Sequence, residues 1–357
     1  MLKILDRYII WKFLTTFFFM LGVIMILATV FDLSEKLSEF IANDASVSEV
    51  VFDYYVNFIL FYSNMFSSMI IFVSVIWFTA KMAQDTEIIP IWNSGKKFGR
   101  FVRPYMIAAT ILMLLSLFSN HFIIPRSNQT RLDFEEKFYR NTITVQDYHA
   151  EFPGNTVVYF TSYSAENDII HNLVVEKWSE DQKLISFLKA TTAKNLEKKN
   201  WKLFNYYGRV VGYPNDRIFE GEIKDTVLEF RIDEMATREN IAEAMTYFEL
   251  KDFIQREQGK GSSMVPMYEI ELYQRTSYPF ATYVLTIIGI AVASRKKRGG
   301  VGINIAMGLG IIFVYIFAMK VTTVSALNLG FTASIAVWIP NVLFGGVAYL
   351  LYRNAMK

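Results

Sequence analysis

The chain has 357 residues, a formal net charge of +2, 53% hydrophobic residues and 20% charged residues. Soluble domains carry roughly 25% charged residues, and the apolar residues here are gathered in long runs, so a single soluble domain is excluded. Between residues 125 and 275 acidic residues outnumber basic ones, which excludes a nucleic-acid-binding insert.

Six apolar runs are long enough to cross a membrane, because a hydrocarbon layer of roughly 30 Å takes about 20 residues in a helix. None of them contains Asp, Glu, Lys or Arg. In chain order they are residues 13–31, 54–80, 105–124, 276–294, 299–319 and 331–352. The sequence therefore predicts an α-helical membrane protein with three spans, a long insert and three more spans.

Basic residues gather on alternate loops, which the positive-inside rule places in the cytoplasm. They are Lys3, Arg7, Lys12, Lys81, Lys96, Lys97, Arg100, Arg103, Arg295, Lys296, Lys297, Arg298, Arg353 and Lys357. Both termini are thus predicted to be cytoplasmic and the large insert to lie outside. The first span is expected to be an anchor and not a cleaved signal, because its apolar run is long and no clear small-x-small site follows it.

The insert is predicted to be all-β and to end in a helix. Short runs rich in β-branched and aromatic residues alternate with turn clusters, a pattern typical of a sandwich or an open barrel. A helix should start at Thr246, whose side chain can form a capping box with Glu249, and should stop at Gly259. The expected strands are residues 157–160, 184–188, 203–211 and 226–232.

Motifs for catalysis or cofactor binding are not found in this chain. There is no P-loop and no H-E-x-x-H, cysteine is absent, and the three histidines (His121, His149 and His171) are far apart. The spans hold no carboxylate pair, which argues against an ion-coupled transporter. We therefore expect a non-catalytic subunit that binds neither a metal nor a cofactor. Glycines of the fifth span are expected to allow close helix packing, namely Gly300, Gly302, Gly308 and Gly310.

The inner loop 81–103 is longer than a turn requires and has an apolar centre flanked by cations. Two interpretations remain open for this centre. It lies on the lipid interface as an amphipathic segment, or it docks a cytoplasmic partner, with Trp92 and the isoleucines as anchors and Glu87 as a polar contact. The residues concerned are Glu87, Ile88, Ile89, Pro90, Ile91 and Trp92.

Over essentially its whole length the chain resembles the LptF/LptG permease family of lipopolysaccharide export. The start Leu5-Asp6-Arg7-Tyr8-Ile9 with Phe13 and Thr15-Thr16 resembles the LptG branch more than the LptF branch. The other matching motifs follow in the family's order. They are Thr86-Glu87-Ile88-Ile89 with Ser94-Gly95, Leu188-Lys189-Ala190, Trp201, Met245-Thr246 with Glu249-Leu250, Glu271 with Arg275 and Pro279-Phe280, and Trp338 with Pro340-Asn341.

This resemblance implies an architecture and a set of partners. Residues 1–124 and 276–357 would form six membrane helices, and 125–275 a periplasmic β-jellyroll-like domain. An LptF–LptG pair would sit above a dimer of the ATPase LptB, which uses ATP and Mg. Lipopolysaccharide would leave the inner membrane of a Gram-negative bacterium and pass through the jellyroll toward LptC and LptA.

The resemblance also implies a lateral gate between the first helix of one subunit and the fifth of its partner. In this chain the gate helices correspond to residues 13–31 and 299–319. Apolar side chains of the first helix offer surface to acyl chains or simply face the lipid: Phe17, Phe18, Phe19, Met20 and Met25. Lys320 either meets a lipid phosphate or extends to the interface.

The outer end of the first helix departs from the family pattern, in which basic residues are frequent. Asp32 and Glu35 stand there, with Lys36 as the nearby cation. The contact with phosphate would then come from the partner subunit, from Lys320, or through a divalent cation that bridges carboxylate and phosphate.

Two other classes of function fit the same topology. One is a membrane sensor or assembly scaffold whose external domain binds a ligand, and the other is a secondary lipid transporter. The absence of an output domain disfavours the sensor. Retention of an ATPase partner through the inner loop would separate export from both alternatives.

Overall fold

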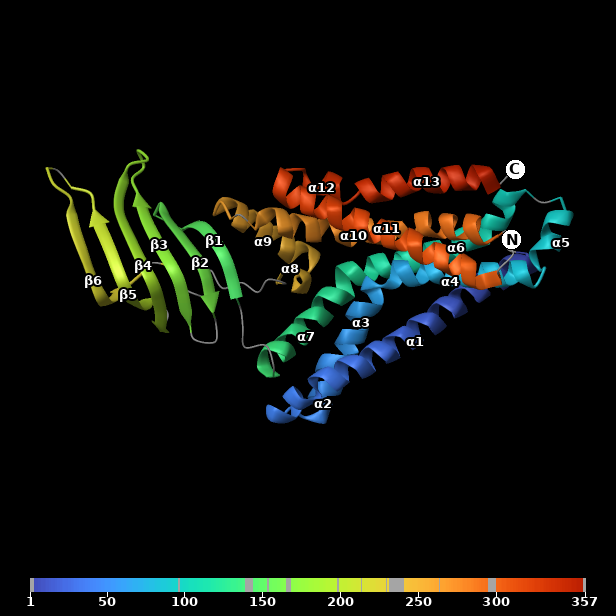
Figure 1. The fold of residues 1–357 in the computed structure, drawn as a ribbon, viewed down its shortest axis with the longest axis horizontal. Helices are drawn as coiled ribbons and strands as arrows, with labels where there is room; N and C mark the ends of the chain where they lie inside the picture. Colours follow the sequence, from blue (N-terminus) through green and yellow to red (C-terminus); the bar gives the residue numbers. More distant parts are fainter. Residues whose placement is uncertain are drawn as a thin grey trace. The chain divides into compact units, whose positions relative to one another are not determined.

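The computed structural model describes residues 3–355 apart from 96, 139–143, 153, 165–167, 198, 213, 229, 231–240, 263 and 295–299. The chain divides into two compact units. One comprises Met1–Ile41, Ser46–Arg131 and Glu269–Lys357, and the other comprises Ala42–Ala45 and Leu132–Tyr268. The first is helical and the second is built around a sheet (Figure 1).

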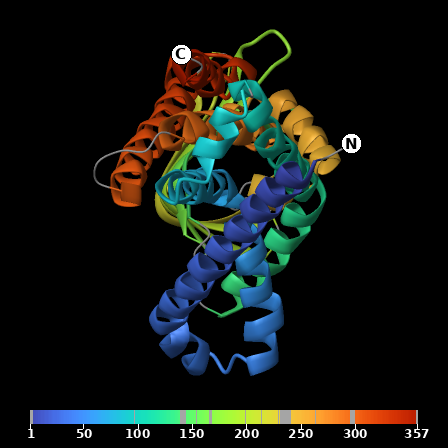
Figure 2. The ribbon, with the colours of Figure 1, turned by 90° about the vertical axis from the view of Figure 1, so that its right-hand side faces the viewer.

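Six helical stretches among the described residues are long and apolar enough to cross a membrane, three before the sheet and three after it. This confirms the predicted number and grouping of spans. The helices concerned are α1 (Ile4–Ala42), α4 (Ser67–Gln84), α6 (Phe98–Phe118) with its continuation, α10 (Val265–Ala293), α11 (Gly300–Leu329), and α12 (Ala333–Ala336) followed by α13 (Ile339–Ala355). Figures 1 and 2 show α1 as one long continuous helix.

The second apolar run is not one span. Its elements are α2 (Val47–Glu49), the π-helix η1 (Val50–Tyr55), α3 (Val56–Met65) and α4. Phe66 separates α3 from α4: its N–H bonds the carbonyls of Asn64 and Tyr62, and the two helices meet at an angle in Figure 1. No glycine or proline marks this break, so hydropathy alone does not reveal it.

The third span also changes its helical form. After α6 come the π-helix η2 (Ser119–Ile123) and α7 (Ile124–Phe138). Pro125 has no N–H to donate to the carbonyl four residues earlier. The widened turn lies just before that proline, which accounts for its position.

Glycine brings two helices close to α4. A Cβ on Gly308 of α11 would collide with Cδ1 of Ile76, and one on Gly289 of α10 would lie 3.0 Å from Cγ1 of Val75. The packing role predicted for Gly308 is therefore confirmed. No described atom lies within 4 Å of a Cβ at Gly302 or Gly310, so close packing within the chain is confirmed for neither, and Gly300 starts α11 with a φ of +70°.

The insert forms one antiparallel sheet whose six described strands lie in chain order, which confirms an all-β insert. Its buried side includes the fully enclosed Phe160, Leu173 and Trp201. Each described strand pairs with the next one along the chain. The Greek-key crossings of a jelly roll are therefore not seen among the described strands. The strands are β1 (Thr144–Phe152), β2 (Thr156–Ser164), β3 (Ile169–Trp178), β4 (Leu184–Glu197), β5 (Asn200–Val210) and β6 (Arg217–Val227).

Two strands, β1 and β3, fall where no strand was predicted, and β6 overlaps a predicted strand only at its end. β6 is a polar, largely exposed strand with five acidic or basic residues, so it lacks the apolar signal of a strand. The strand expected at 226–232 contributes only its first two residues to β6. Residues 229, 231 and 232 lie outside the described part of the chain.

Two helices follow the sheet, α8 (Ile241–Ala244) and α9 (Tyr247–Gly259). The predicted capping box of α9 is present, with the Thr246 N–H bonded to Glu249 Oε2 at 2.8 Å. After α9 the carbonyl of Lys260 accepts the N–H of Glu151 at 2.9 Å. The chain after α9 thus contacts the side of β1 that faces away from β2, and β6 is the last described strand at the other end of the sheet.

Candidate functional site

The inner loop is folded as a short helix held against the helical unit. α4 ends at Gln84, a turn follows, and α5 spans Ile88–Asn93. Thr86, in this turn, has a φ of +61°. Ile88 and Ile91 are 2% and 7% exposed and belong to the same buried cluster as side chains of α1 and α6.

The remaining residues predicted for partner docking face in different directions. Ile89 is 47% exposed, and Pro90 is exposed as well. The side chain of Trp92 lies outside the described part of the chain. The loop therefore combines an inner apolar side, formed by Ile88 and Ile91, with an outer side that includes Ile89.

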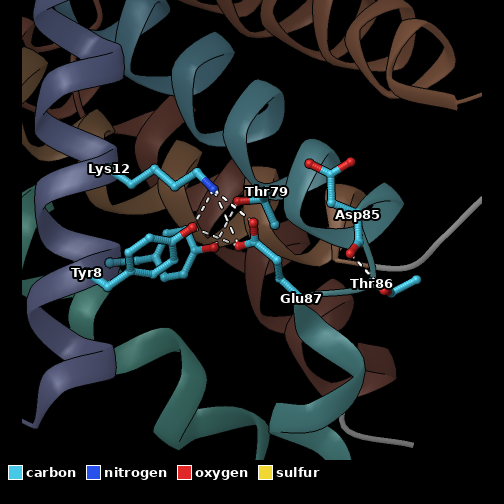
Figure 3. A network of polar contacts seen from close by, with 7 residues as sticks. Tyr8, Lys12, Thr79, Asp85, Thr86 and Glu87 are labelled. Atoms are coloured by element: carbon cyan, nitrogen blue, oxygen red, sulfur yellow. Dashed lines mark hydrogen bonds and ion pairs between the residues drawn. The ribbon is translucent and has the colours of Figure 1, made fainter.

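Glu87 is bonded to the first turns of α1 (Figure 3). The hydroxyl of Tyr8 donates to Glu87 Oε2 at 2.8 Å, and Lys12 Nζ lies 3.4 Å from the same oxygen. Lys12 Nζ also donates to the Tyr8 hydroxyl at 2.7 Å. Asp85 points away from this group in Figure 3. The three side chains thus link the loop directly to α1.

A second ion pair lies nearby, between α1 and the start of α6. Arg100 Nη1 and Nη2 donate to the two carboxylate oxygens of Asp6 at 2.6 and 2.8 Å. The Asp6 side chain is 3% exposed and also accepts the backbone N–H of Lys3 at 2.9 Å. A bidentate pair of this kind fixes orientation as well as distance.

The apolar candidates of α1 divide between the interior and the surface. Phe17 and Met25 are each 4% exposed, and Met20 packs on the buried cluster. Phe18 and Phe19 are 51% and 71% exposed. Of the predicted apolar candidates, Phe18 and Phe19 are therefore the two that α1 presents to lipid or to another subunit.

The charged residues at the far end of α1 form a compact group. Lys36 Nζ lies 2.7 Å from Asp32 Oδ1, and the Tyr54 hydroxyl of η1 donates to the same oxygen at 3.2 Å. Lys36 also donates to the Tyr54 hydroxyl. Lys36, a candidate for lipid binding at this end of α1, is thus paired with Asp32 of the same helix. Lys320 of α11 is exposed.

The chain thus has a helical membrane unit, whose first helix is bonded to an inner loop, and an inserted β-sheet. The model of the lipopolysaccharide export system permease family LptF/LptG matches residues 7–354. The chain belongs to this family. No curated protein matches the chain.

Family membership gives the permease its substrate and its location. It is a non-catalytic membrane component of lipopolysaccharide transport and a multi-pass protein of the inner membrane. The family model covers both branches, so it does not assign this permease to LptF or to LptG. Membership favours export over the sensor and the secondary transporter.

Sequence reasoning missed most of the permease's polar partners. Tyr8 and Lys12 lie 79 and 75 residues before Glu87, and 94 residues separate Asp6 from Arg100. The motif Leu5-Asp6-Arg7-Tyr8 was visible as a polar interruption before an apolar helix. The two adjacent charges, Asp6 and Arg7, are the local signal of a structural role.

Proposed function

We propose that this permease is half of an ATP-driven lipopolysaccharide exporter, in which the inner loop 81–103 couples nucleotide hydrolysis to movement of α1. A paralogous LptF or LptG subunit completes the membrane part. A dimer of the ATPase LptB docks on the cytoplasmic side and uses ATP and Mg, because the chain itself has no nucleotide motif.

The contacts of Glu87 with Tyr8 and Lys12 are the observation that carries this proposal. A force applied to the loop reaches α1 through these bonds and through the pair Arg100–Asp6. Ile88 and Ile91 add apolar contact with the same bundle. The loop and the start of α1 therefore move together when the ATPase closes.

The distribution of basic residues supports the orientation in this scheme. The loop that bears Glu87 is flanked by Lys81, Lys97, Arg100 and Arg103, so it lies in the cytoplasm with both termini. The sheet then lies in the periplasm. From there β6, the last strand of the described sheet, can accept a further strand from a periplasmic bridge of the LptC and LptA type.

The lipid path follows from the exposed and charged side chains. Phe18 and Phe19 contact acyl chains at the lateral gate, and the buried side of the sheet receives them afterwards. The Asp32–Lys36 pair is nearly neutral as a unit, so Lys320, the partner subunit or a bridging divalent cation supplies charge to the phosphates.

Glu87→Lys tests this function in the reconstituted complex. The variant reverses the charge beside Lys12, and we expect ATP hydrolysis to continue while lipopolysaccharide release is lost. Asp85→Lys is the matched control, since it makes the same change on an exposed side chain that points away from α1 (Figure 3). Full release by Glu87→Lys would remove this residue from the coupling role.

A further inference from the structure

Helix α10 carries Pro279 in its interior, within a membrane-spanning stretch. Proline has no N–H and its ring crowds the carbonyl four residues earlier, so the carbonyl of Arg275 loses its helical partner. In a membrane such a carbonyl needs a replacement donor. Asn120 of η2 provides one, because its Nδ2 donates to the Arg275 carbonyl at 3.1 Å.

Two further carbonyls beside the proline receive side-chain donors from other helices. Asn341 Nδ2 donates to the carbonyl of Ser277 at 2.9 Å, and Ser68 Oγ donates to that of Tyr278 at 3.3 Å. Asn341 is 6% exposed, and its Oδ1 accepts the hydroxyl of Tyr315 at 2.8 Å. Donors from η2, α4 and α13 thus converge on one turn of α10, and α11 joins them through Tyr315.

Asn120 is itself held at a place where neighbouring helices are irregular. Its Oδ1 accepts from Asn64 Nδ2, and Asn64 Oδ1 accepts from Ser116 Oγ at 2.9 Å. Asn64 stands just before the break between α3 and α4 at Phe66, and Asn120 lies inside a π-helix. π-helical turns and helix breaks are frequent at functional positions.

Two buried hydroxyl groups flank Pro279 without a hydrogen-bond partner among the described residues. They are Ser277 Oγ and Thr282 Oγ1, and both residues are 0% exposed. Buried polar groups are nearly always bonded, so each exception calls for an explanation. In this conformation neither hydroxyl makes a hydrogen bond with a described residue, and a different bend of α10 would allow each to find a partner.

We propose that α10 bends at Pro279 during lipid export, that Asn120 and Asn341 are positioning residues for one bend, and that Ser277 and Thr282 take up hydrogen bonds in the other. The bend gives a role to three residues of the family motifs: Arg275, Pro279 and Asn341. The bend is a property of this chain, and only its transport readout rests on the proposed ATP-driven cycle.

The bend is measured on the full chain with spin labels on either side of the proline. The chain has no cysteine, so Tyr273→Cys with Ala291→Cys gives two unique sites on α10. Pro279→Ala restores the missing N–H, and we expect the distance distribution to lengthen and narrow. Distributions that coincide with and without Pro279→Ala would overturn the proposal.

The role of Asn120 is separated from general packing by a double-mutant cycle. Asn120→Leu removes its bond with Asn64 in every background. It should therefore lower the thermal midpoint in both, but less in the Pro279→Ala background, where the backbone supplies the Arg275 carbonyl with a donor. An equal loss in both backgrounds shows that Asn120 does not serve the proline, and contradicts its positioning role.

The rate of lipopolysaccharide release separates a role in transport from a structural role, because a proline needed only for folding would not change it. In the reconstituted exporter, Pro279→Ala should slow lipopolysaccharide release several-fold while the thermal midpoint is kept or raised. Unchanged release with a straightened α10 contradicts the role in export. If the native complex hydrolyses ATP without releasing lipid, the proposed function fails, and the spin-label distances still decide whether α10 bends.

Discussion

The carboxylate of Asp6 on α1 accepts two hydrogen bonds from the guanidinium of Arg100 on α6, at 2.6 and 2.8 Å. The carboxylate is nearly buried, whereas the guanidinium is 27% exposed. The pair joins the residue just inside the start of α1 to the helix that follows the inner loop. It is thus the second of two polar links between α1 and the loop region.

Asp6→Asn is expected to destabilise the helical unit by about 2 kcal/mol, less than a fully buried pair because Arg100 is partly exposed to solvent. The thermal unfolding midpoint in detergent measures this. Glu35→Gln on the same helix removes an exposed carboxylate and serves as the control. A midpoint that falls equally in both variants contradicts a specific role for the Asp6–Arg100 pair.

Tyr8→Phe keeps the ring but removes the hydroxyl, which donates to Glu87 and accepts from Lys12. We expect the link between loop and α1 to weaken by about 1 kcal/mol and lipid release per ATP hydrolysed to fall. Release and hydrolysis measured together on the reconstituted complex check this. An unchanged ratio means that the Tyr8 hydroxyl does not contribute to coupling.

Gly308→Val tests the close approach of α11 to α4. The new side chain meets Ile76, and overpacking of this kind costs roughly 1–3 kcal/mol. Gly310→Val is the matched control, since nothing lies within 4 Å of a Cβ at that position. We expect a lower thermal midpoint for the first variant alone, and equal midpoints would contradict the packing assigned to Gly308.

Trp201→Ala should leave a cavity on the buried side of the sheet and destabilise the insert. Trp201 is 0% exposed, and removal of a buried aromatic side chain costs roughly 3–5 kcal/mol. Limited proteolysis of the full chain should then cut within the insert before it cuts the helices. Ile223→Ala, on a strand residue that is 61% exposed, should leave the cleavage pattern as it is.

Single cysteines determine the orientation, because the native chain has none. A cysteine at Ile223 in β6 should react with a membrane-impermeant maleimide added to cells whose outer membrane is permeabilised. A cysteine at Ile89 should react only after the inner membrane is opened. The reverse pattern would invert the predicted topology.

The elements that were predicted correctly depend on local chemistry. Apolar runs mark the spans because only apolar side chains are stable in the hydrocarbon layer. The start of α9 was predicted correctly because Thr246 and Glu249 interact within one turn. The break at Phe66 has no local signal. β6 is exposed along most of its length, so its pattern resembles a polar loop.

The site was predictable only in part, for the same reason. Glu87 and Lys36 stand out as charges beside apolar runs, but their partners lie on other helices. Tyr54 reaches Lys36 and Asp32 from the π-helix η1, and Tyr8 reaches Glu87 across 79 residues of sequence. Side chains that meet through helix packing leave no spacing pattern in the sequence.

The most direct test of coupling replaces the ion pair of Lys12 and Glu87 by a covalent link. With Lys12→Cys and Glu87→Cys, the reconstituted exporter should hydrolyse ATP but release little lipopolysaccharide. A bismaleimide that joins the two thiols should restore release, whereas a monofunctional maleimide should not. If release stays at the unlinked level after complete cross-linking, the loop and α1 do not move together and the account is contradicted.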